Sequence, residues 1–416
     1  MSRKQLTIGL FGFGCVGEGL YKVLQRTPTL KTDIAKICIK HADKKRSIDA
    51  QVFTTDKNEL LNNNAINVIV ELIDDSEAAF EIVKAGLLSG RPVVTANKKM
   101  LAEHFEELLE LQRSTGSQLL YEASCCASIP LIRNLEEYYD NDLLGNVEGI
   151  MNGSTNYILD RMDQAKVEFT EALIEAQTAG YAESNPALDV EGLDAANKLL
   201  IVVAHAFGKV LLPEQIFCNG ITKLGSIEQA YAREKGFKIK LVARAGKDEF
   251  GNLFAFVLPT FVKHDSQLAH VNDVYNGVNL KSSFSESQFF LGKGAGAFPT
   301  ASAVLSDLSA LSYNYKYEYR KLGAELQVAD DETVLLEVFW RNAGSIQQAG
   351  IYFKELQEVH QTGFGGYLIG KISLKNLKVL QSKYPLSSTV LFDRVAANAA
   401  QKEYNLAELE QVIELN

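Results

Sequence analysis

Residues 6–17 read LTIGLFGFGCVG, an apolar run followed at once by the pattern GxGxxG. The run predicts a buried strand, and residues 16–24 have helical periodicity. In this context the first glycine permits a tight turn, the second lets backbone approach a pyrophosphate, and the third allows close helix–strand packing. The pyrophosphate would lie at the positive end of the helix. A purely structural glycine turn is the alternative. The motif predicts dinucleotide binding by Gly12, Phe13, Gly14, Cys15, Val16 and Gly17.

Around this turn, short apolar runs alternate with amphipathic segments. The run at 6–11 has strand-like successors at 34–39, 68–73, 92–96 and 119–122, with a helix at 77–88. Such alternation indicates right-handed βαβ units and a parallel sheet. We therefore predict an α/β fold whose residues 1–130 form a Rossmann-type, doubly wound domain.

The pattern changes after residue 130. Residues 131–290 predict a second α/β domain for catalysis and dimerisation, with strands at 146–151, 238–245 and 254–261. Residues 291–320, helical at 301–311, are expected to return to the nucleotide-binding domain. Residues 321–416 predict a small C-terminal α/β extension of unassigned role, with strands at 333–339 and 367–373. A divergent regulatory domain is one interpretation of this segment.

The composition excludes several classes of protein. A net charge of −10 disfavours nonspecific nucleic-acid binding, which depends on neutralising phosphates with Lys and Arg. No uncharged apolar run reaches the length of a membrane helix, and the polar residues 1–7 show no signal peptide. The five cysteines form no CxxC pair, which argues against a zinc site and suits a reducing compartment. We expect a cytoplasmic protein without nucleic-acid or membrane partners.

The end of the second predicted strand bears on cofactor choice. An NAD site usually has an acidic residue here, whereas basic residues suit the 2′-phosphate of NADP. Lys40 lies at this point, and Lys44, Lys45 and Arg46 follow shortly. The pattern favours NADP, although Asp43 leaves NAD open and a solvated charged loop is the alternative.

A second informative stretch is AGYAESNPALDVEGLDAANK, residues 179–198. Asp194 and Lys198 are four residues apart and share one helix face, which on spacing alone favours an ordinary surface ion pair. The apolar residues 199–204 that follow suggest burial, and Glu183 and Asp189 add two carboxylates. A partly buried lysine among acids suits amine recognition and proton donation. A second lysine, Lys98, follows a strand end, where open α/β sheets bind ligands.

Four segments resemble the homoserine dehydrogenase family, in its order, over roughly residues 6–311. They are TANK at 95–98, GIMNGSTNYI at 149–158, the stretch 179–198, and GKGAGAFPTASAV at 292–304. The resemblance implies NAD(P)H-dependent reduction of L-aspartate 4-semialdehyde to L-homoserine in threonine, methionine and isoleucine biosynthesis. It also implies a homodimer.

The resemblance also implies residue roles. Lys198 would be the proton donor, with Asp194 as its orienting partner, and Lys98 would lie between nicotinamide and substrate. Glu183 would hold the substrate's amino group, with Asp189 nearby. The remaining assignments are Gly153 and Thr155 to the substrate pocket, and Gly294 and Gly296 to the cofactor.

The family binds a monovalent cation, Na⁺ or K⁺, in a segment matching residues 122–130. The ligands implied here are Glu122, through its carboxylate, and the carbonyls of Cys125, Ala127 and Ile129. The chain departs from the family by having Cys-Cys-Ala-Ser where Val and small glycines are usual, and Asp74-Asp75 where Gly-Gly is frequent. Residues after 321 lack the glycine-containing ligand turn of an ACT regulatory domain, so feedback inhibition is not predicted.

Two alternatives stay open. A thiol-dependent semialdehyde dehydrogenase would use Cys125 or Cys126 as its nucleophile. A non-catalytic NAD(P)-binding sensor would bind nucleotide without turnover. The first leaves the lysine-centred motif unexplained, and the second leaves a complete set of catalytic residues unused.

Overall fold

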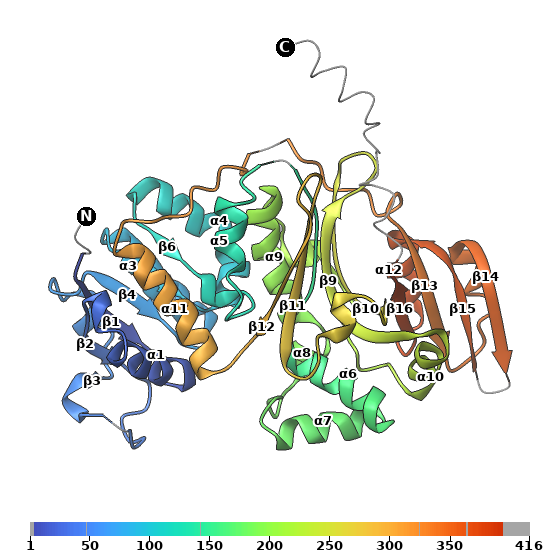
Figure 1. The fold of residues 1–416 in the computed structure, drawn as a ribbon, viewed down its shortest axis with the longest axis horizontal. Helices are drawn as coiled ribbons and strands as arrows, with labels where there is room; N and C mark the ends of the chain where they lie inside the picture. The colour runs from blue at the N-terminus through green and yellow to red at the C-terminus, as the bar shows by residue number, and fades with distance from the viewer. Residues whose placement is uncertain (1–3, 47, 142, 324, 363–364, 394–416) are drawn as a thin grey trace, which may run out of the picture.

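The computed structural model describes residues 4–393 except 47, 142, 324 and 363–364. The N-terminal part forms a six-stranded sheet in the order β3-β2-β1-β4-β5-β6, in which every neighbouring pair is parallel (Figure 1). The strands are β1 (Leu6–Phe11), β2 (Thr32–Cys38), β3 (Phe53–Thr54), β4 (Val68–Glu71), β5 (Val93–Thr95) and β6 (Leu119–Leu120). The order reverses between β1 and β4, as in a doubly wound sheet. The predicted Rossmann-type fold is confirmed.

Helices cover this sheet, so its central strands β1, β4 and β5 are buried and mainly apolar. These helices are α1 (Cys15–Gln25), α2 (Asn58–Leu61), α3 (Ser76–Leu88) and α4 (Lys98–Thr115). The strand expected at 119–122 is shorter than predicted. It ends at Leu120 because the chain leaves the extended conformation at Tyr121 and turns through the short helix η3 (Glu122–Ser124).

The second sheet has ten strands and is mainly antiparallel. Its first six are β7 (Leu144–Ile150), β8 (Phe217–Cys218), β9 (Phe237–Lys247), β10 (Leu253–Lys263), β11 (Tyr275–Ser282) and β12 (Glu286–Lys293). The accompanying helices are α5 (Leu131–Glu137), α6 (Gly153–Ala165), α7 (Phe169–Thr178), α8 (Ala187–Val190), α9 (Leu193–Phe207) and α10 (Ser226–Lys235). The sheet thus supplies the second α/β region expected from the sequence.

Helix α9 lies at the centre of the molecule (Figure 1). It packs against α4 of the nucleotide-binding part and against β9 and β10 of the second sheet. Nearly all of its residues are buried, which explains why its sequence is almost entirely apolar after Lys198. The charged residues in its first two turns are therefore held in place by a rigid element.

The C-terminal segment extends the second sheet. It contributes β13 (Leu335–Asn342), β14 (Phe353–Thr362), β15 (Gly365–Ser373), α12 (Leu374–Lys383) and β16 (Ser388–Phe392). Strand β16 pairs in parallel with β10, with Thr260 opposite Leu391 and Phe261 opposite Phe392. A separate hydrophobic cluster around Trp340 is completed by Phe254, Phe256 and Leu258 of β10. The extension therefore shares both hydrogen bonds and core with the second sheet.

Helix α11 (Ala297–Leu311) returns to the N-terminal part and packs on α1 (Figure 1). The polypeptide thus crosses between the two sheets three times, and the segment before α11 borders the space between them. No helix in the described ranges has the length and apolar character needed to span a bilayer.

Candidate active site

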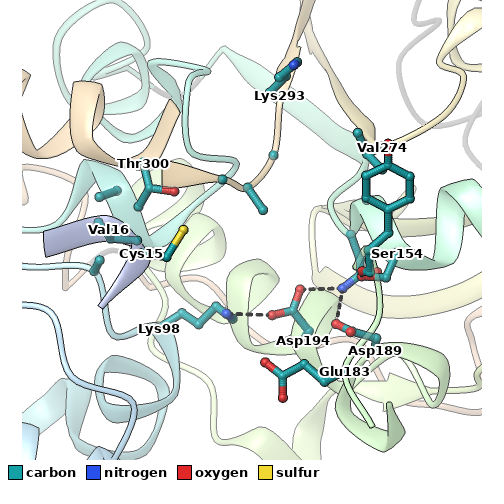
Figure 2. A pocket seen from close by; sticks show the side chains of 18 of the residues that line it. Cys15, Val16, Lys98, Ser154, Glu183, Asp189, Asp194, Val274, Lys293 and Thr300 are labelled. Atoms are coloured by element: carbon teal, nitrogen blue, oxygen red, sulfur yellow. Dashed lines mark hydrogen bonds and ion pairs between the residues drawn. The ribbon is translucent and has the colours of Figure 1, made fainter. Parts of the chain in front are cut away.

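A cavity of about 800 Å³ lies between the nucleotide-binding part and the second sheet (Figure 2). One wall comes from the glycine turn and the ends of β4 and β5, and the other from α6, the 180–189 loop and α9. The predicted site residues that line it are Cys15, Val16, Lys98, Gly153, Glu183, Asp189, Asp194, Lys198, Gly294 and Gly296. The fold therefore brings together residues almost 300 positions apart.

Asp194 and Lys198 occupy the first two turns of α9 and form a buried ion pair. Lys198 Nζ lies 2.7 Å from Asp194 Oδ2 and donates to the carbonyl of Met151 at 2.6 Å. Only 6% of Asp194 and 7% of Lys198 are exposed. This burial excludes the ordinary surface ion pair that the spacing alone favoured.

Lys98 reaches the same carboxylate from the other wall. It is the first residue of α4, and its Nζ lies 2.9 Å from Asp194 Oδ1. The Lys98 side chain remains 40% exposed, because its ammonium group faces the cavity. Figure 2 shows this contact crossing from the nucleotide-binding side to the catalytic side. Asp194 therefore bridges two ammonium groups from different parts of the fold.

Asn152 completes the cluster and was not assigned a role from the sequence. Its Nδ2 donates to Asp189 Oδ1 at 2.6 Å and to Asp194 Oδ2 at 2.8 Å. Its Oδ1 accepts from the Thr155 backbone N–H at 2.8 Å, so Asn152 is the N-cap of α6. An Asn directly before a helix is a recognisable capping signal. The two carboxylates that its amide orients are far away in the sequence, so no local pattern shows them.

The charges in this cluster explain the shifted ionisation of its members. Burial acts to raise the pKa of Asp194, but the ammonium groups of Lys198 and Lys98 outweigh it and hold that pKa well below its usual range. Burial acts to lower the pKa of Lys198, but Asp194 reverses this and raises it. Burial and then the charge of Asp194 raise the pKa of Asp189. Lys198 is thus kept as an ammonium ion beside an open cavity.

The predicted substrate residues differ in their access to the cavity. Glu183 is exposed at its edge, and its carboxylate points into open space in Figure 2. Gly153 also borders the cavity, whereas Thr155 is buried behind Asn152 and is not among the lining residues. The Thr155 hydroxyl instead donates to the Asn152 carbonyl at 3.1 Å. Tyr181, which the sequence analysis left without a role, borders the cavity as well.

The glycine turn has the shape that a dinucleotide requires. Gly12 has φ +92°, and an added Cβ would lie 2.5 Å from the carbonyl oxygen of Leu72. A Cβ on Gly17 would lie 2.3 Å from the carbonyl oxygen of Gly12, whereas one on Gly14 would meet no atom within 4 Å. The turn is therefore closely packed at Gly12 and Gly17 and open at Gly14. Phe13 lies away from the opening, where it packs edge-on against Tyr21 and Phe53.

A second cavity, of about 680 Å³, adjoins the end of β2. Lys44, Lys45 and Arg46 line it together with Asp43. The Arg46 guanidinium donates to the carbonyls of His41 and Lys44, both at 2.7 Å, and lies over the Phe53 ring. Lys40 is exposed and is not among the residues that line either cavity.

The segment expected to bind a monovalent cation is closely packed. Glu122 Oε1 accepts from the Ile132 N–H at 2.8 Å and Oε2 from the Arg133 N–H at 2.9 Å, so the carboxylate caps α5. The carbonyl of Ile129 accepts from the Leu131 N–H at 2.8 Å. Ala127, like the residue before it, has positive φ, so the turn keeps a shape that usually favours glycine. Each Glu122 oxygen keeps a second lone pair, so the fit to a cation is partial.

The adjacent thiols do not support a nucleophilic role. Cys125 and Cys126 are fully buried, and burial raises the pKa of both. The thiolate is the nucleophilic form of cysteine, so a buried thiol with a raised pKa is unreactive. The thiol-dependent alternative is therefore not favoured.

Comparisons with known proteins agree with this geometry. The family models described as "Homoserine dehydrogenase, NAD binding domain" and "Homoserine dehydrogenase" match residues 12–122 and 130–309. Similar curated proteins include the homoserine dehydrogenases of Synechocystis sp., 38% identical over 72% of each chain, and of Helicobacter pylori, 35% identical over 74% of this chain and 73% of that one.

Solved structures give the same result. A homoserine dehydrogenase from Thiobacillus denitrificans is 28% identical, with a TM-score of 0.84 over 94% of this chain and 99% of that one. A hyperthermophilic archaeal homoserine dehydrogenase mutant in complex with NADPH shares the fold, at 23% identity and a TM-score of 0.65 over 76% of this chain and 100% of that one. The chain belongs to the homoserine dehydrogenase family and is an NAD(P)-dependent oxidoreductase.

Proposed function

We propose that the protein reduces L-aspartate 4-semialdehyde to L-homoserine with NADPH, and that Lys198 is the proton donor. The observation that carries this proposal is the buried Lys198–Asp194 pair at the wall of the interdomain cavity, with Lys98 on the opposite oxygen of the same carboxylate. A salt bridge buried against an open cavity contributes little to stability relative to apolar residues. A catalytic role explains why it is there.

The nicotinamide cofactor supplies the hydride when bound. The residues that would hold it are those of the glycine turn, 12–17, together with Lys98, Gly294 and Gly296, all of which border or support the cavity. The open space above Gly14 and the start of α1 suit a pyrophosphate. This arrangement would align the cofactor with the ammonium groups around Asp194.

Lys198 then acts on the substrate oxygen. As hydride reaches the aldehyde carbon, negative charge develops on that oxygen, and an ammonium group both stabilises it and donates a proton. The raised pKa of Lys198 favours the protonated form that this direction needs. Asp194 orients the ammonium group, and Asn152 holds Asp194.

Substrate recognition is assigned to the carboxylates of the second wall. Glu183, an exposed acid on the second wall of the cavity, would bind the substrate's amino group, and Asp189 lies nearby, held by Asn152. Gly153 leaves room for the substrate's carbon chain at the start of α6. Thr155 would contribute through the conformation of that turn, because its hydroxyl is already bonded to Asn152.

The cofactor preference is assigned to NADP. Lys44, Lys45 and Arg46 around the second cavity supply positive charge for a 2′-phosphate, and Lys40 would add a longer-range contribution from the surface. Asp43 in the same loop is the feature that favours NAD. Comparing kcat/KM for NADP and NAD in homoserine oxidation tests this assignment.

Further assignments rest on the family and on the cysteines. A Na⁺ or K⁺ ion near Glu122 would use the carbonyls of Cys125, Ala127 and Ile129, and activity measured with and without potassium tests it. The assembly is a homodimer, which light scattering of the purified protein tests. The compartment is the cytoplasm, which suits five free thiols.

The decisive experiment is steady-state homoserine oxidation by the Lys198→Met variant. We expect kcat to fall roughly 100- to 10,000-fold with NADPH binding retained, because only the proton-transferring group is lost. Lys99→Met, on the exposed neighbour of Lys98, is the matched control and should keep full activity. Full turnover by Lys198→Met would contradict the assignment.

A further inference from the structure

Glu71 is a buried acid at the edge of the cavity to which no role has been assigned so far. It is the last residue of β4, where it pairs with Phe11 of β1 and Thr95 of β5. Its side chain is completely buried. These three strand ends lie at the point where the strand order reverses, which is where doubly wound sheets bind ligands.

The Glu71 carboxylate closes a ring of hydrogen bonds. Its Oε1 accepts from the Ile73 N–H at 2.6 Å, and its Oε2 accepts from the Thr95 hydroxyl at 2.5 Å. The Thr95 oxygen accepts from the Asn97 N–H at 3.0 Å, and Asn97 Nδ2 donates to the Ile73 carbonyl at 3.1 Å. We call the residues Glu71, Ile73, Thr95 and Asn97 the Glu71 ring.

The ring joins two loops that belong to the nucleotide-binding wall of the cavity. One loop follows β4 and borders the cavity through Leu72, Ile73 and Asp74. The other follows β5 and leads to Lys98. Asn97 is also the N-cap of α4, since its Oδ1 accepts from the Met100 N–H at 2.9 Å. The ring therefore fixes the position from which the Lys98 side chain starts.

The ring requires a carboxylate rather than a carboxylic acid. Both Glu71 oxygens accept hydrogen bonds, and a proton on Oε2 would compete with the Thr95 hydroxyl. Burial raises the pKa of Glu71 to about 7, and the charge of Asp74 acts in the same direction, while the bonds from Thr95 and Ile73 oppose it. Burying an ionised acid costs desolvation free energy, so a carboxylate is an unfavourable choice for stabilising a turn. Its presence calls for a purpose other than stability.

We propose that Glu71 is a positioning residue for hydride transfer. Through Thr95 and Asn97 it holds the Lys98 ammonium group against Asp194, and through Ile73 it keeps the loop after β4 aligned with the loop after β5. The inference rests on the proposed function, because it needs Lys98 to contribute to turnover. It distinguishes Glu71 from the catalytic residues, since Glu71 is enclosed by protein and touches neither substrate nor cofactor.

The test uses Thr95→Val, which removes the hydroxyl while keeping its shape, together with Glu71→Gln. For both we expect kcat of homoserine oxidation to fall roughly 10-fold, because small misplacements of aligned groups are costly in rate. The dissociation constant of NADPH, measured by fluorescence, and the KM for homoserine should change less than about threefold. The isotope effect with homoserine deuterated at the hydroxyl-bearing carbon should rise. Thr95→Ser restores the hydroxyl and should restore kcat to within about twofold.

A double-mutant cycle separates positioning from general damage. In a Lys98→Met background, Thr95→Val should cost less than about twofold, because the group it positions is gone. Glu81→Gln, an exposed acid on α3, is the control and should match the unmodified protein. The same fold loss from Thr95→Val in both backgrounds, or full kcat in Thr95→Val alone, would overturn the inference. Should Glu71→Gln fail to fold, the Thr95 pair decides the question.

Failure of the proposed function and failure of this inference would give different results. An unmodified protein that does not oxidise homoserine would overturn the proposed function and, with it, this inference. Full activity of Lys98→Met would contradict only the role of Lys98, and would remove the target of the Glu71 ring.

Discussion

The two walls of the cavity are built on different physical principles. The nucleotide-binding wall is shaped by backbone, where Gly12 and Gly17 let main-chain atoms approach more closely than any side chain allows. The catalytic wall is made of charged and polar side chains, with Lys198 and Asn152 both in direct contact with Asp194. Adding atoms should therefore damage the first wall, and removing atoms should damage the second.

The largest expected effect comes from adding one methyl group to the backbone wall. In Gly17→Ala the new Cβ would lie 2.3 Å from the Gly12 carbonyl oxygen, so the turn must open. We expect NADPH affinity to fall at least about 1000-fold, or roughly 4 kcal/mol. Titration of intrinsic fluorescence with NADPH measures it.

Gly14→Ala is the matched control for that change. Its Cβ would meet no atom within 4 Å, so the melting temperature should stay native. Weaker NADPH binding by this variant, at native stability, would place the dinucleotide directly over Gly14. A Gly17→Ala protein with native affinity would break the contrast between the two walls.

The next effect concerns the buried acid beneath the backbone wall. Because the pKa of Glu71 is raised from 4.5 to about 7 in the folded protein, the native state binds the proton more tightly than the unfolded state. The contribution of Glu71 to stability is therefore largest below about pH 4.5 and is lost as pH rises to about 7. Glu71→Gln removes this pH dependence, which amounts in total to about 3 kcal/mol of the free energy of unfolding.

Urea denaturation of both proteins between pH 5 and pH 8 tests the slope. The free energy of unfolding of the Gln variant, relative to that of the unmodified protein, should increase steadily up to neutral pH and then stay constant. A constant difference between the two curves would contradict the raised pKa.

A smaller effect is expected from removing an amide in the catalytic wall. Asn152→Ala leaves Asp189 and Asp194 without their shared donor and uncaps α6. We expect kcat to fall roughly 10- to 100-fold, since a lost hydrogen bond to a charged group costs about 1.5–3 kcal/mol. Asn185→Ala, in the exposed loop before α8, is the control and should leave kcat unchanged.

The smallest effect is predicted at the second cavity, next to the end of β2. Lys45→Ala beside the second cavity should weaken NADP relative to NAD by about threefold, or roughly 0.7 kcal/mol, because exposed charges interact weakly. The ratio of kcat/KM values for the two cofactors, at low and high salt, measures it. An unchanged ratio would leave cofactor choice to other residues of the loop.

The same contrast explains how much could be predicted from sequence. The glycine turn is a contiguous pattern whose meaning depends on local backbone geometry, so residues 6–17 predict both the fold and the place of the cofactor. The Asp194–Lys198 pair was visible as spacing, and the apolar residues 199–204 after it indicated burial, but the hydrogen bond from Asn152 to Asp194 was not visible. His205 lies among apolar residues of α9, a pattern that indicates burial, and in the structure it is buried and bonded to Glu136 and Tyr121.

What could not be predicted depends on contacts between distant segments. The partners of Asn152 lie about 40 residues away, and the Glu71 ring joins two loops that are separated in the chain. Strand β14 was missed because most of it is exposed, so it lacks the apolar alternation of a half-buried strand. Strand β16 was also missed, and its pairing with β10 and β13 again joins distant segments.

The parallel pairing of β16 with β10 has a consequence for shortened versions of the protein. Residues 388–392 cover the end of a strand whose side chains are buried on both faces, from Leu253 to Val262. Trimming the chain before residue 388 would uncover unsatisfied main-chain groups flanked by Phe261 and its apolar neighbours, a template on which other chains could add. Insolubility of such a truncation would therefore reflect a newly opened edge, and it would carry no information about catalysis.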